Sequence, residues 1–238
     1  MCFDCGCHHS YRFKKEAPYE IAVMENILAG NDAQAAVNRA AFATAGQLAI
    51  NLMSSPGAGK TRWLEITAEA LGAERMAVIE GDLETENDAR RLRAKGVAAT
   101  QITTGRACHL NAELVAKGVE RLPAGGRPYL FIENVGNLVC PADFDLGQHA
   151  NVVLLAVTEG DDKPEKYPPI FRAADLVLIT KIDLMPLLDD FDLERAKAHI
   201  ARIQPATRVL SCSDRTGAGM AEWLAWLAEQ QEHLCHAH

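Results

Sequence analysis

The sequence predicts an α/β fold: a mostly parallel sheet flanked by helices, preceded by N-terminal helices and a Cys-rich tail. Three observations support this. Short runs rich in Val, Ile and Leu alternate with helical segments, which is typical of sheets covered on both faces. A Gly-rich stretch directly follows one of these runs. The 238 residues, 48% of them hydrophobic, are enough for one large domain with its own core.

The elements are expected in the following order. Residues 1–16 form a flexible metal-binding tail and residues 17–238 the folded domain. Helices across 17–47 pack on that domain, with a break at Gly30-Asn31-Asp32 between two stretches of helical apolar spacing. Strands are predicted at 49–53, 76–80, 98–102, 129–133, 152–157, 176–180 and 208–210, and helices at 61–71, 111–121, 193–203 and 220–230.

Composition excludes several classes of function. The net charge of −8 argues against a nucleic-acid-binding face, which would be basic. No segment approaches the roughly 18 apolar residues of a membrane span, and the N-terminus lacks the pattern of a secretory signal. We therefore expect a cytoplasmic protein, whose seven cysteines are metal ligands or core residues instead of disulfides.

A phosphate-binding loop is predicted where the apolar run 48–53 leads into SSPGAGKT. Glycines let backbone N–H groups turn towards an anion, a Lys reaches the β- and γ-phosphates, and the Thr hydroxyl ligates Mg²⁺. Ser54 stands where the usual P-loop has its first Gly, which requires a negative φ there. The alternative is a plain Gly-rich turn. The predicted nucleotide-binding residues of the loop are Pro56, Gly57, Ala58, Gly59, Lys60 and Thr61.

Guanine is the base that the next motif favours. Thr180-Lys181-Ile182-Asp183 closes a predicted strand. The Asp183 carboxylate can accept from guanine N1–H and the 2-amino group, a donor pair that adenine lacks. The stem of Lys181 can pack on the base, and Ser211 can offer its backbone N–H to the guanine O6. A solvated Lys/Asp pair and a Ser-rich turn are the alternatives.

Two acidic residues at strand ends, Asp82 and Glu133, are candidate Mg²⁺ ligands. The segment 133–136 resembles the D-x-x-G switch of GTPases, with Glu in place of Asp, so the N–H of Gly136 would meet the γ-phosphate. The alternative is that Asp82 and Glu133 are surface carboxylates without a functional role. With Lys60 and Thr61 these two acids are the predicted catalytic residues. No residue stands out as the base that positions water, so slow intrinsic hydrolysis is expected.

Two metal sites are predicted. Cys2, Cys5 and Cys7 place three thiols in one short segment, which suits Ni²⁺ or Zn²⁺, and the alternative is an unoccupied thiol tail. Cys108 and His109, expected at a helix start, combine with Cys140 in an incomplete site that a symmetric dimer could complete. The alternative for the second site is a buried thiol and a polar helix start. Cys235, His236 and His238 form a third cluster, for which a frayed tail is the favoured interpretation. Cys212 is expected to be structural, and His149 and His199 are expected at the surface or the edge of the core.

The chain resembles the HypB family of hydrogenase nickel-incorporation GTPases, in MCFDCGC, NLMSSPGAGKT, EGDLETENDA, TGRACHLNA, IENVGNLVCPA, TEGDDKPEKYP and ITKIDL. The resemblance implies a P-loop GTPase that binds GTP and GDP, dimerises around nucleotide, and delivers nickel to the [NiFe] hydrogenase large subunit with a HypA-type metallochaperone. It also implies a tight nickel site in the tail, a nickel or zinc site at Cys108, His109 and Cys140, and contact of Lys163 with nucleotide across the dimer.

The spacing of the two sites suggests a link between them. Cys140 comes only four positions after Gly136, so we hypothesise that nucleotide state and metal affinity are coupled reciprocally. Three other functions compete: a nickel buffer with a nucleotide domain as scaffold, a GTPase for urease or a cobalamin enzyme, and a small-molecule kinase. The guanine motif counts against the kinase.

Overall fold

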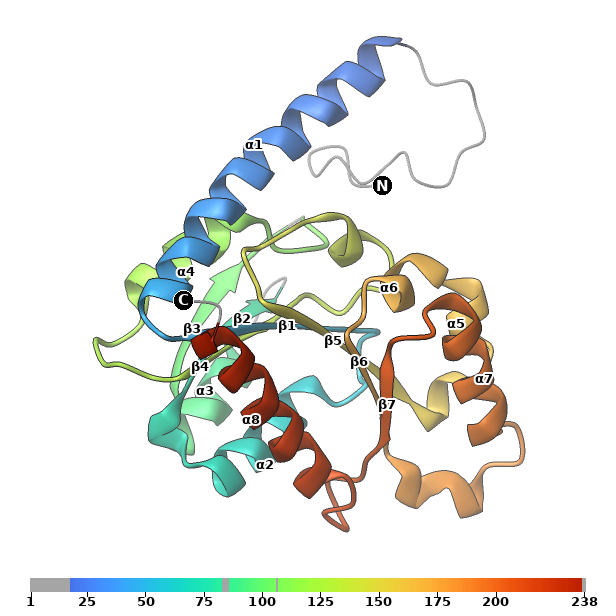
Figure 1. Cartoon of the computed structure of the whole chain (residues 1–238). Coiled ribbons are helices and arrows are strands. Elements are labelled where there is room, and N and C mark those ends of the chain that lie inside the picture. The colour runs from blue at the N-terminus through green and yellow to red at the C-terminus, as the bar shows by residue number, and fades with distance from the viewer. Residues whose placement is uncertain (1–17, 83–85, 106, 237–238) are drawn as a thin grey trace.

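The computed structural model describes residues 18–82, 86–105 and 107–236. Its sheet has seven strands in the order β3-β2-β4-β1-β5-β6-β7, and every neighbouring pair is parallel (Figure 1). This confirms the predicted fold class. The strands are β1 (Leu48–Ser54), β2 (Met76–Asp82), β3 (Ala98–Thr103), β4 (Tyr129–Glu133), β5 (Ala150–Ala156), β6 (Leu176–Thr180) and β7 (Arg208–Ser211).

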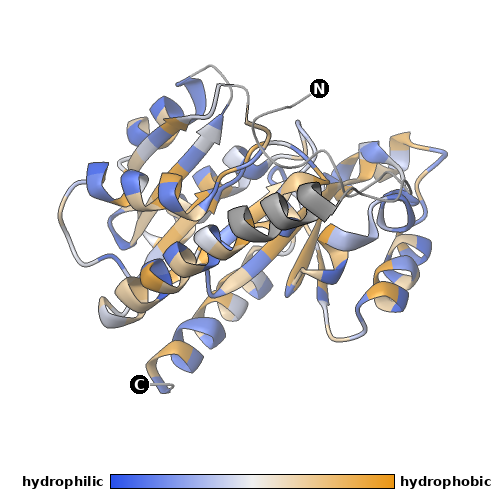
Figure 2. Ribbon diagram, turned by 90° about the horizontal axis from the view of Figure 1, so that it is seen from above, coloured by the Kyte–Doolittle hydropathy of each residue, from blue (hydrophilic) through white to orange (hydrophobic). Residues whose placement is uncertain are grey.

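Helices cover both faces of the sheet (Figures 1 and 2). The apolar cores place α2, α3 and α8 on one face, and α1, α4, α6 and α7 on the other. The helices are α1 (Pro18–Thr44), α2 (Lys60–Leu71), α3 (Asn87–Ala94), α4 (Ala112–Arg121), α5 (Lys163–Lys166), α6 (Pro168–Arg172), α7 (Leu193–Ile203) and α8 (Met220–His236). Short 3₁₀ turns are η2 (Ala73–Arg75), η3 (Cys140–Asp143), η4 (Val157–Glu159) and η5 (Ile182–Leu187).

The central strand β1 anchors the loop that follows it. All seven of its residues are buried. Leu48, Ile50 and Leu52 face the core that contains α2 and α8, while Ala49 and Met53 face the opposite cores. Burying each large side chain contributes about 1.5–3 kcal/mol. The loop after β1 therefore starts from a fixed point at the carboxyl edge of the sheet, where such folds bind ligands.

Two helices differ from the prediction. The predicted break at Gly30–Asp32 is wrong, because α1 is one continuous helix. Its Asn31 amide donates to the Asp145 carbonyl (2.8 Å) and accepts from the Ala112 N–H (2.9 Å), which offsets the cost of about 1 kcal/mol for a helical Gly. Helix α8 runs six residues past its predicted end at 230, because Leu234 still packs on the core.

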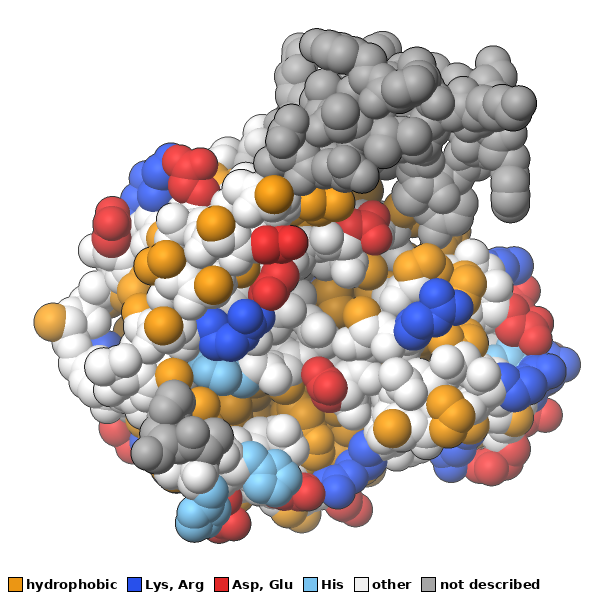
Figure 3. All heavy atoms as spheres, turned by 45° about the horizontal axis from the view of Figure 1, so that its top comes forward, with side chains coloured by type: hydrophobic (Ala, Val, Ile, Leu, Met, Phe, Trp, Pro, Cys, Tyr) orange, Lys and Arg blue, Asp and Glu red, His pale blue; other side chains and the backbone are white. Residues whose placement is uncertain are grey.

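No helix in the described part of the chain is long and apolar enough to cross a bilayer. On the face seen in Figure 3, Lys and Arg side chains lie interspersed with Asp and Glu. The predicted boundary between residues 16 and 17 lies outside the described residues.

Candidate nucleotide and metal sites

The loop between β1 and α2 has the backbone of a phosphate cradle. Gly57 and Gly59 adopt φ values of +79° and +101°, a region that costs a residue with a Cβ considerable strain. Gly59 immediately precedes α2, so the free N–H groups of the first helical turn open towards the loop. The condition on Ser54 is met, since Lys181 is the only described non-glycine residue with positive φ.

Lys60 is held over this loop. Its side chain is buried, and Nζ donates to the Ser54 hydroxyl at 2.9 Å. The hydroxyl in turn donates to the Ser55 carbonyl at 2.6 Å. The Ser that replaces the usual Gly thus gives the ammonium a partner inside the loop, which keeps the charge near the position that phosphates would occupy.

Buried carboxylates face Thr61 across the cavity. The Thr61 hydroxyl donates to Glu133 Oε1 at 2.8 Å. Glu133 and Glu80 are only 4% and 2% exposed, and Oε2 of each has no hydrogen-bond partner within the described structure. Oxygen atoms of Glu80, Asp88 and Glu133 lie within 4.8 Å of one another. These are the oxygen donors that Mg²⁺ prefers, so the residues fit a divalent cation.

Burial governs the protonation of these acids. It raises the pKa of Glu133 to about 7. It raises the pKa of Glu80 to about 8, with the neighbouring Glu133 charge adding to the effect. Sequence reasoning missed Glu80 and Asp88. An acid inside an otherwise apolar strand was the available signal for Glu80. The predicted ligand Asp82 ends β2 and lines the same cavity.

The cavity has a volume of about 630 Å³ and brings the phosphate loop together with the predicted base-binding motif. At the base end, the Thr180 hydroxyl donates to the Ala58 carbonyl at 2.7 Å. Lys181 Nζ donates to the Gly57 carbonyl at 2.7 Å. The predicted site residues that line the cavity are Pro56, Gly57, Ala58, Gly59, Lys60, Thr61, Asp82, Glu133, Gly136, Lys181 and Asp183.

The loop after β7 contributes differently from the prediction. Ser211 pairs with Ile179 inside the sheet. Two residues further on, the Ser213 hydroxyl donates to Asp183 Oδ1 at 2.6 Å and so orients the carboxylate. From this loop, Asp214 and Arg215 line the cavity.

Gly136 is packed directly on the phosphate loop. A Cβ at this position would lie 2.9 Å from the Pro56 Cα and backbone N. Only Gly allows the segment after β4 to approach the P-loop this closely, so a shift of this segment towards the loop would displace Pro56.

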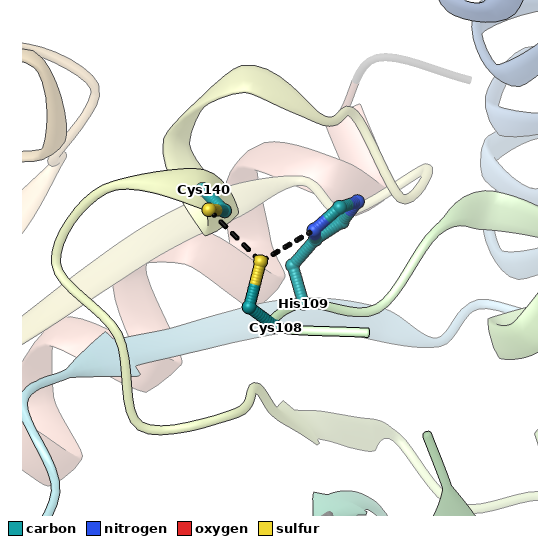
Figure 4. Close-up of side chains that lie close together, drawn as sticks. All are labelled: Cys108, His109 and Cys140. Atoms are coloured by element: carbon teal, nitrogen blue, oxygen red, sulfur yellow. Dashed lines mark hydrogen bonds between the residues drawn. The ribbon is translucent and has the colours of Figure 1, made fainter. Parts of the chain in front are cut away.

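Cys140, four positions after Gly136, lies together with Cys108 and His109 (Figure 4). The Cys108 and Cys140 sulfurs are 3.0 Å apart, and Cys108 Sγ is 3.7 Å from His109 Nδ1. One ligand atom from each residue lies within 4.8 Å of the others. Cys108 and His109 do not begin a helix as predicted: α4 begins at Ala112, with Asn111 as its cap.

The chemistry of this triad suits a soft or borderline cation. His109 is 4% exposed and stacks on Phe144 at a ring-centroid distance of 3.9 Å. Burial lowers the pKa of His109 to about 4, so the imidazole is neutral at physiological pH and can ligate metal. Two thiolates and an imidazole are ligands for Ni²⁺ or Zn²⁺.

The remaining predicted residues lie elsewhere. Cys2, Cys5 and Cys7 fall outside the described residues. Lys163 begins α5, and its ammonium sits over the Tyr167 ring, 5.3 Å from the centroid. Cys212 is fully buried in the core, as predicted, and its burial raises the pKa of the thiol to about 12. Cys235 and His236 are exposed on α8, and His238 lies outside the described residues. His149 is half-buried and accepts from the Ala49 N–H, whereas His199 is buried beside Glu165.

The parallel sheet, the glycine-shaped loop and the buried Lys define a P-loop nucleotide-binding protein. Residues 48–211 match the family described as CobW/HypB/UreG, nucleotide-binding domain. Hydrogenase maturation factor HypB of Azotobacter vinelandii is 52% identical over 212 residues, covering 89% of this chain and 70% of that protein. The chain belongs to the HypB family of hydrogenase maturation factors, which confirms the resemblance seen in the sequence.

Solved structures agree. HypB from Archaeoglobus fulgidus superposes with a TM-score of 0.80 at 40% identity, covering 86% of this chain and all of that one. HypB from Helicobacter pylori in complex with nickel gives 0.81 at 38% identity, covering 86% and 96%. The signal recognition particle 54 kDa protein from Aeropyrum pernix, at 11% identity and a TM-score of 0.52, shares the fold alone.

Proposed function

We propose that this protein is a GTP-hydrolysing nickel metallochaperone that delivers Ni²⁺ to the large subunit of a [NiFe] hydrogenase. GTP and GDP occupy the cavity, and Mg²⁺ is held by Thr61 and Glu133 with Asp82 and Glu80 nearby. Lys60 neutralises charge on the phosphates, and the carboxylate of Asp183 reads guanine. Without a dedicated base for water, hydrolysis is slow, as suits a switch.

The observation that carries the proposal is the continuity of the two sites. Gly136 rests on Pro56 of the P-loop, and four residues later Cys140 lies 3.0 Å from Cys108. A γ-phosphate that orders the segment from Glu133 to Gly136 would therefore shift one ligand of the triad. The relative crystallised with nickel supports nickel as the cargo, and zinc is the competing ion at the triad.

We further propose that the protein acts as a homodimer, in the cytoplasm, with a HypA-type metallochaperone. Three protein ligands leave a four-coordinate ion incomplete, so a second subunit could complete or pair the site. Size-exclusion chromatography with metal analysis, with and without Ni²⁺ and a non-hydrolysable GTP analogue, tests this. A monomer under all four conditions would contradict it. The tail thiols Cys2, Cys5 and Cys7 are proposed as a tight nickel site, and Lys163 as a contact to the partner's nucleotide.

Two other functions stay in contention. A nickel buffer would use the triad and tail without needing hydrolysis. A GTPase for another metal centre is favoured by the Helicobacter pylori relatives named hydrogenase/urease maturation factor HypB, which are 40% identical over 216 residues. Relatives of higher identity are named for hydrogenase alone, so the hydrogenase is proposed first.

Lys60→Ala separates these functions. In cells that make a [NiFe] hydrogenase and carry the variant in place of the parental protein, the large subunit should be left without nickel, because nucleotide is no longer held. Lys95→Ala, which removes an exposed lysine paired with Glu69, is the matched control and should be normal. If Lys60→Ala still loads the hydrogenase at the parental level, the protein is a buffer. If neither removal of this protein from the cell nor the Lys60→Ala substitution changes the nickel content of the hydrogenase, the protein serves another metal centre.

A further inference from the structure

The side-chain amide of Asn137 connects the two halves of the metal triad. Its Oδ1 accepts from the Val139 N–H at 2.9 Å, next to Cys140. Its Nδ2 donates to the Cys108 carbonyl at 3.2 Å, although Cys108 is 29 residues away in the sequence. One planar amide therefore reaches both cysteine segments, and it lies directly after Gly136, the residue packed on the P-loop.

The loop that carries Cys108 and His109 needs such a tether. It lies between β3 and α4, and its described residues form no helix or strand. A second amide, from the buried Asn134, fixes its far end: Oδ1 accepts from the Leu110 N–H at 3.0 Å. Asn134 is itself anchored to Asn51 of β1 at 3.2 Å. The loop is thus held by Asn134 behind His109 and by Asn137 at Cys108.

Metal binding needs the two cysteine segments in one arrangement. Both thiols lose their protons on ligation, so both sulfurs must lie where a single cation can neutralise their charge. Ordering two separate loops at that moment would also cost conformational entropy. A bridge that already holds the Cys108 backbone against the Cys140 segment reduces this entropic cost.

We propose that Asn137 is the positioning residue of the Cys108–His109–Cys140 site. Its amide sets the spacing of the two sulfurs, and it makes the Cys108 half of the site follow any movement of Gly136. This inference rests on the proposed metal site. It adds that the nucleotide signal reaches both halves of the triad and not only Cys140.

Three substitutions divide the role of the amide. Asn137→Asp and Asn137→Ser keep an acceptor for the Val139 N–H but lose the donor to Cys108, and the Asp carboxylate also faces the Cys108 carbonyl oxygen. Asn137→Ala loses both bonds. Removing a group that orients a metal ligand typically weakens affinity by about 10- to 100-fold. Because the bond is to the ligand's backbone, we expect about tenfold for Asp and Ser, and more for Ala.

The experiment uses the full chain with Cys2, Cys5 and Cys7 replaced by Ala, so that only the triad reports. Ni²⁺ and Zn²⁺ affinities are measured by competition with a chromophoric chelator, together with the thiolate-to-Ni²⁺ charge-transfer spectrum. Gln47→Ala is the control, since the Gln47 amide also donates to the backbone of a separate segment, the Arg127 carbonyl at 2.9 Å, but lies before β1, away from both segments of the triad.

The expected result is weaker metal binding and an altered charge-transfer spectrum in all three Asn137 variants, with GDP affinity retained and the Gln47 control unchanged. Parental affinity and spectrum in Asn137→Asp and Asn137→Ser would overturn the inference. An equal loss in Gln47→Ala would also overturn it, because the effect would then be general destabilisation. A parent that binds neither ion would instead remove the proposed metal site itself.

Discussion

The nucleotide cavity and the metal triad share one edge of the sheet, yet they are built in different ways. In the cavity, Lys60 begins α2, Glu133 ends β4 and Glu80 lies within β2. The triad lies on two connections, with Cys140 at the start of a short 3₁₀ turn. The cavity is positioned by the hydrogen bonds of the sheet, whereas the triad is positioned by side-chain amides.

This difference suggests a division of labour. A site on strand ends is rigid and recognises a fixed shape, while a site on tethered loops can change when its tether moves. The segment from Glu133 to Cys140 belongs to both, since it starts at the end of a strand and finishes in the triad. Substitutions should therefore fall into three groups: those that affect the cavity, those that affect the triad, and those that affect the link.

The largest effect is expected at the base end of the cavity. Asp183→Asn should weaken GTP binding about 100-fold, because hydrogen bonds to a charged group contribute about 1.5–3 kcal/mol each. It should also improve binding of xanthosine triphosphate, whose 2-oxygen accepts from an amide. Fluorescence titration with both nucleotides measures this, with exposed Asp189→Asn as control. Unchanged GTP affinity would show that Asp183 does not read the base, and altered Ni²⁺ affinity without nucleotide would break the separation of the sites.

The next largest effect is expected in the triad. In the chain lacking tail cysteines, Cys108→Ser and Cys140→Ser should each weaken Ni²⁺ binding at least about tenfold, since a neutral hydroxyl replaces a thiolate. GDP affinity in metal-free protein should stay at the parental level. Cys235→Ser, at an exposed thiol, is the control for general loss of sulfur. Retention of Ni²⁺ by both triad variants would show that the ion binds elsewhere.

The link should respond to a single methyl group. Gly136→Ala places a Cβ 2.9 Å from the Pro56 backbone, and such overpacking costs about 1–3 kcal/mol. We expect weaker binding of the GTP analogue than of GDP, by about tenfold relative to the parent, as measured by isothermal titration. Gly126→Ala, where a Cβ has open space, should leave that ratio unchanged. An unaltered ratio in Gly136→Ala would mean that this segment does not sense the terminal phosphate.

The smallest effect concerns pH. Because burial raises the pKa of Glu80 to about 8, the folded chain keeps a proton that the unfolded chain loses above pH ~4.5. Stability of the ligand-free protein should therefore be fully present below that pH, fall as pH rises, and level off above about 8. Between pH 5.5 and 8.5, the free energy of unfolding of Glu80→Gln should fall by about 1 kcal/mol or more less than that of the parent, since one pKa unit is worth about 1.4 kcal/mol.

Thermal unfolding at several pH values checks this prediction, with exposed Glu232→Gln as control. The comparison is between variants because His109 has the opposite slope: its pKa is lowered to about 4, so it contributes stability that is lost as pH falls from about 6.5. An identical slope in Glu80→Gln and the parent would show that Glu80 is ionised in the folded chain at neutral pH.

The same contrast explains how much the sequence could predict. All seven strands, the loop at Gly57 to Thr61 and the neighbourhood of Cys108 and Cys140 follow from local patterns or the family resemblance, and the structure places them together. The roles of Ser213 and Asn137 could not be predicted, because each depends on a contact to a residue that is distant along the chain. Glu80 left a local signal as an acid in an apolar strand, but its grouping with Asp88 and Glu133 depends on other elements. The break at Gly30 was mispredicted for the same reason, since the partners of Asn31 lie in other elements.

The most direct test of the link is the Ni²⁺ affinity of the chain without tail cysteines, bound to GDP and bound to a non-hydrolysable GTP analogue. Coupling between sites typically changes affinity about 5- to 150-fold, and by the same factor in both directions. We therefore predict at least a fivefold difference in Ni²⁺ affinity between the two nucleotide states, and the same ratio when nucleotide is titrated with and without Ni²⁺. Equal Ni²⁺ affinities in both states would contradict the account.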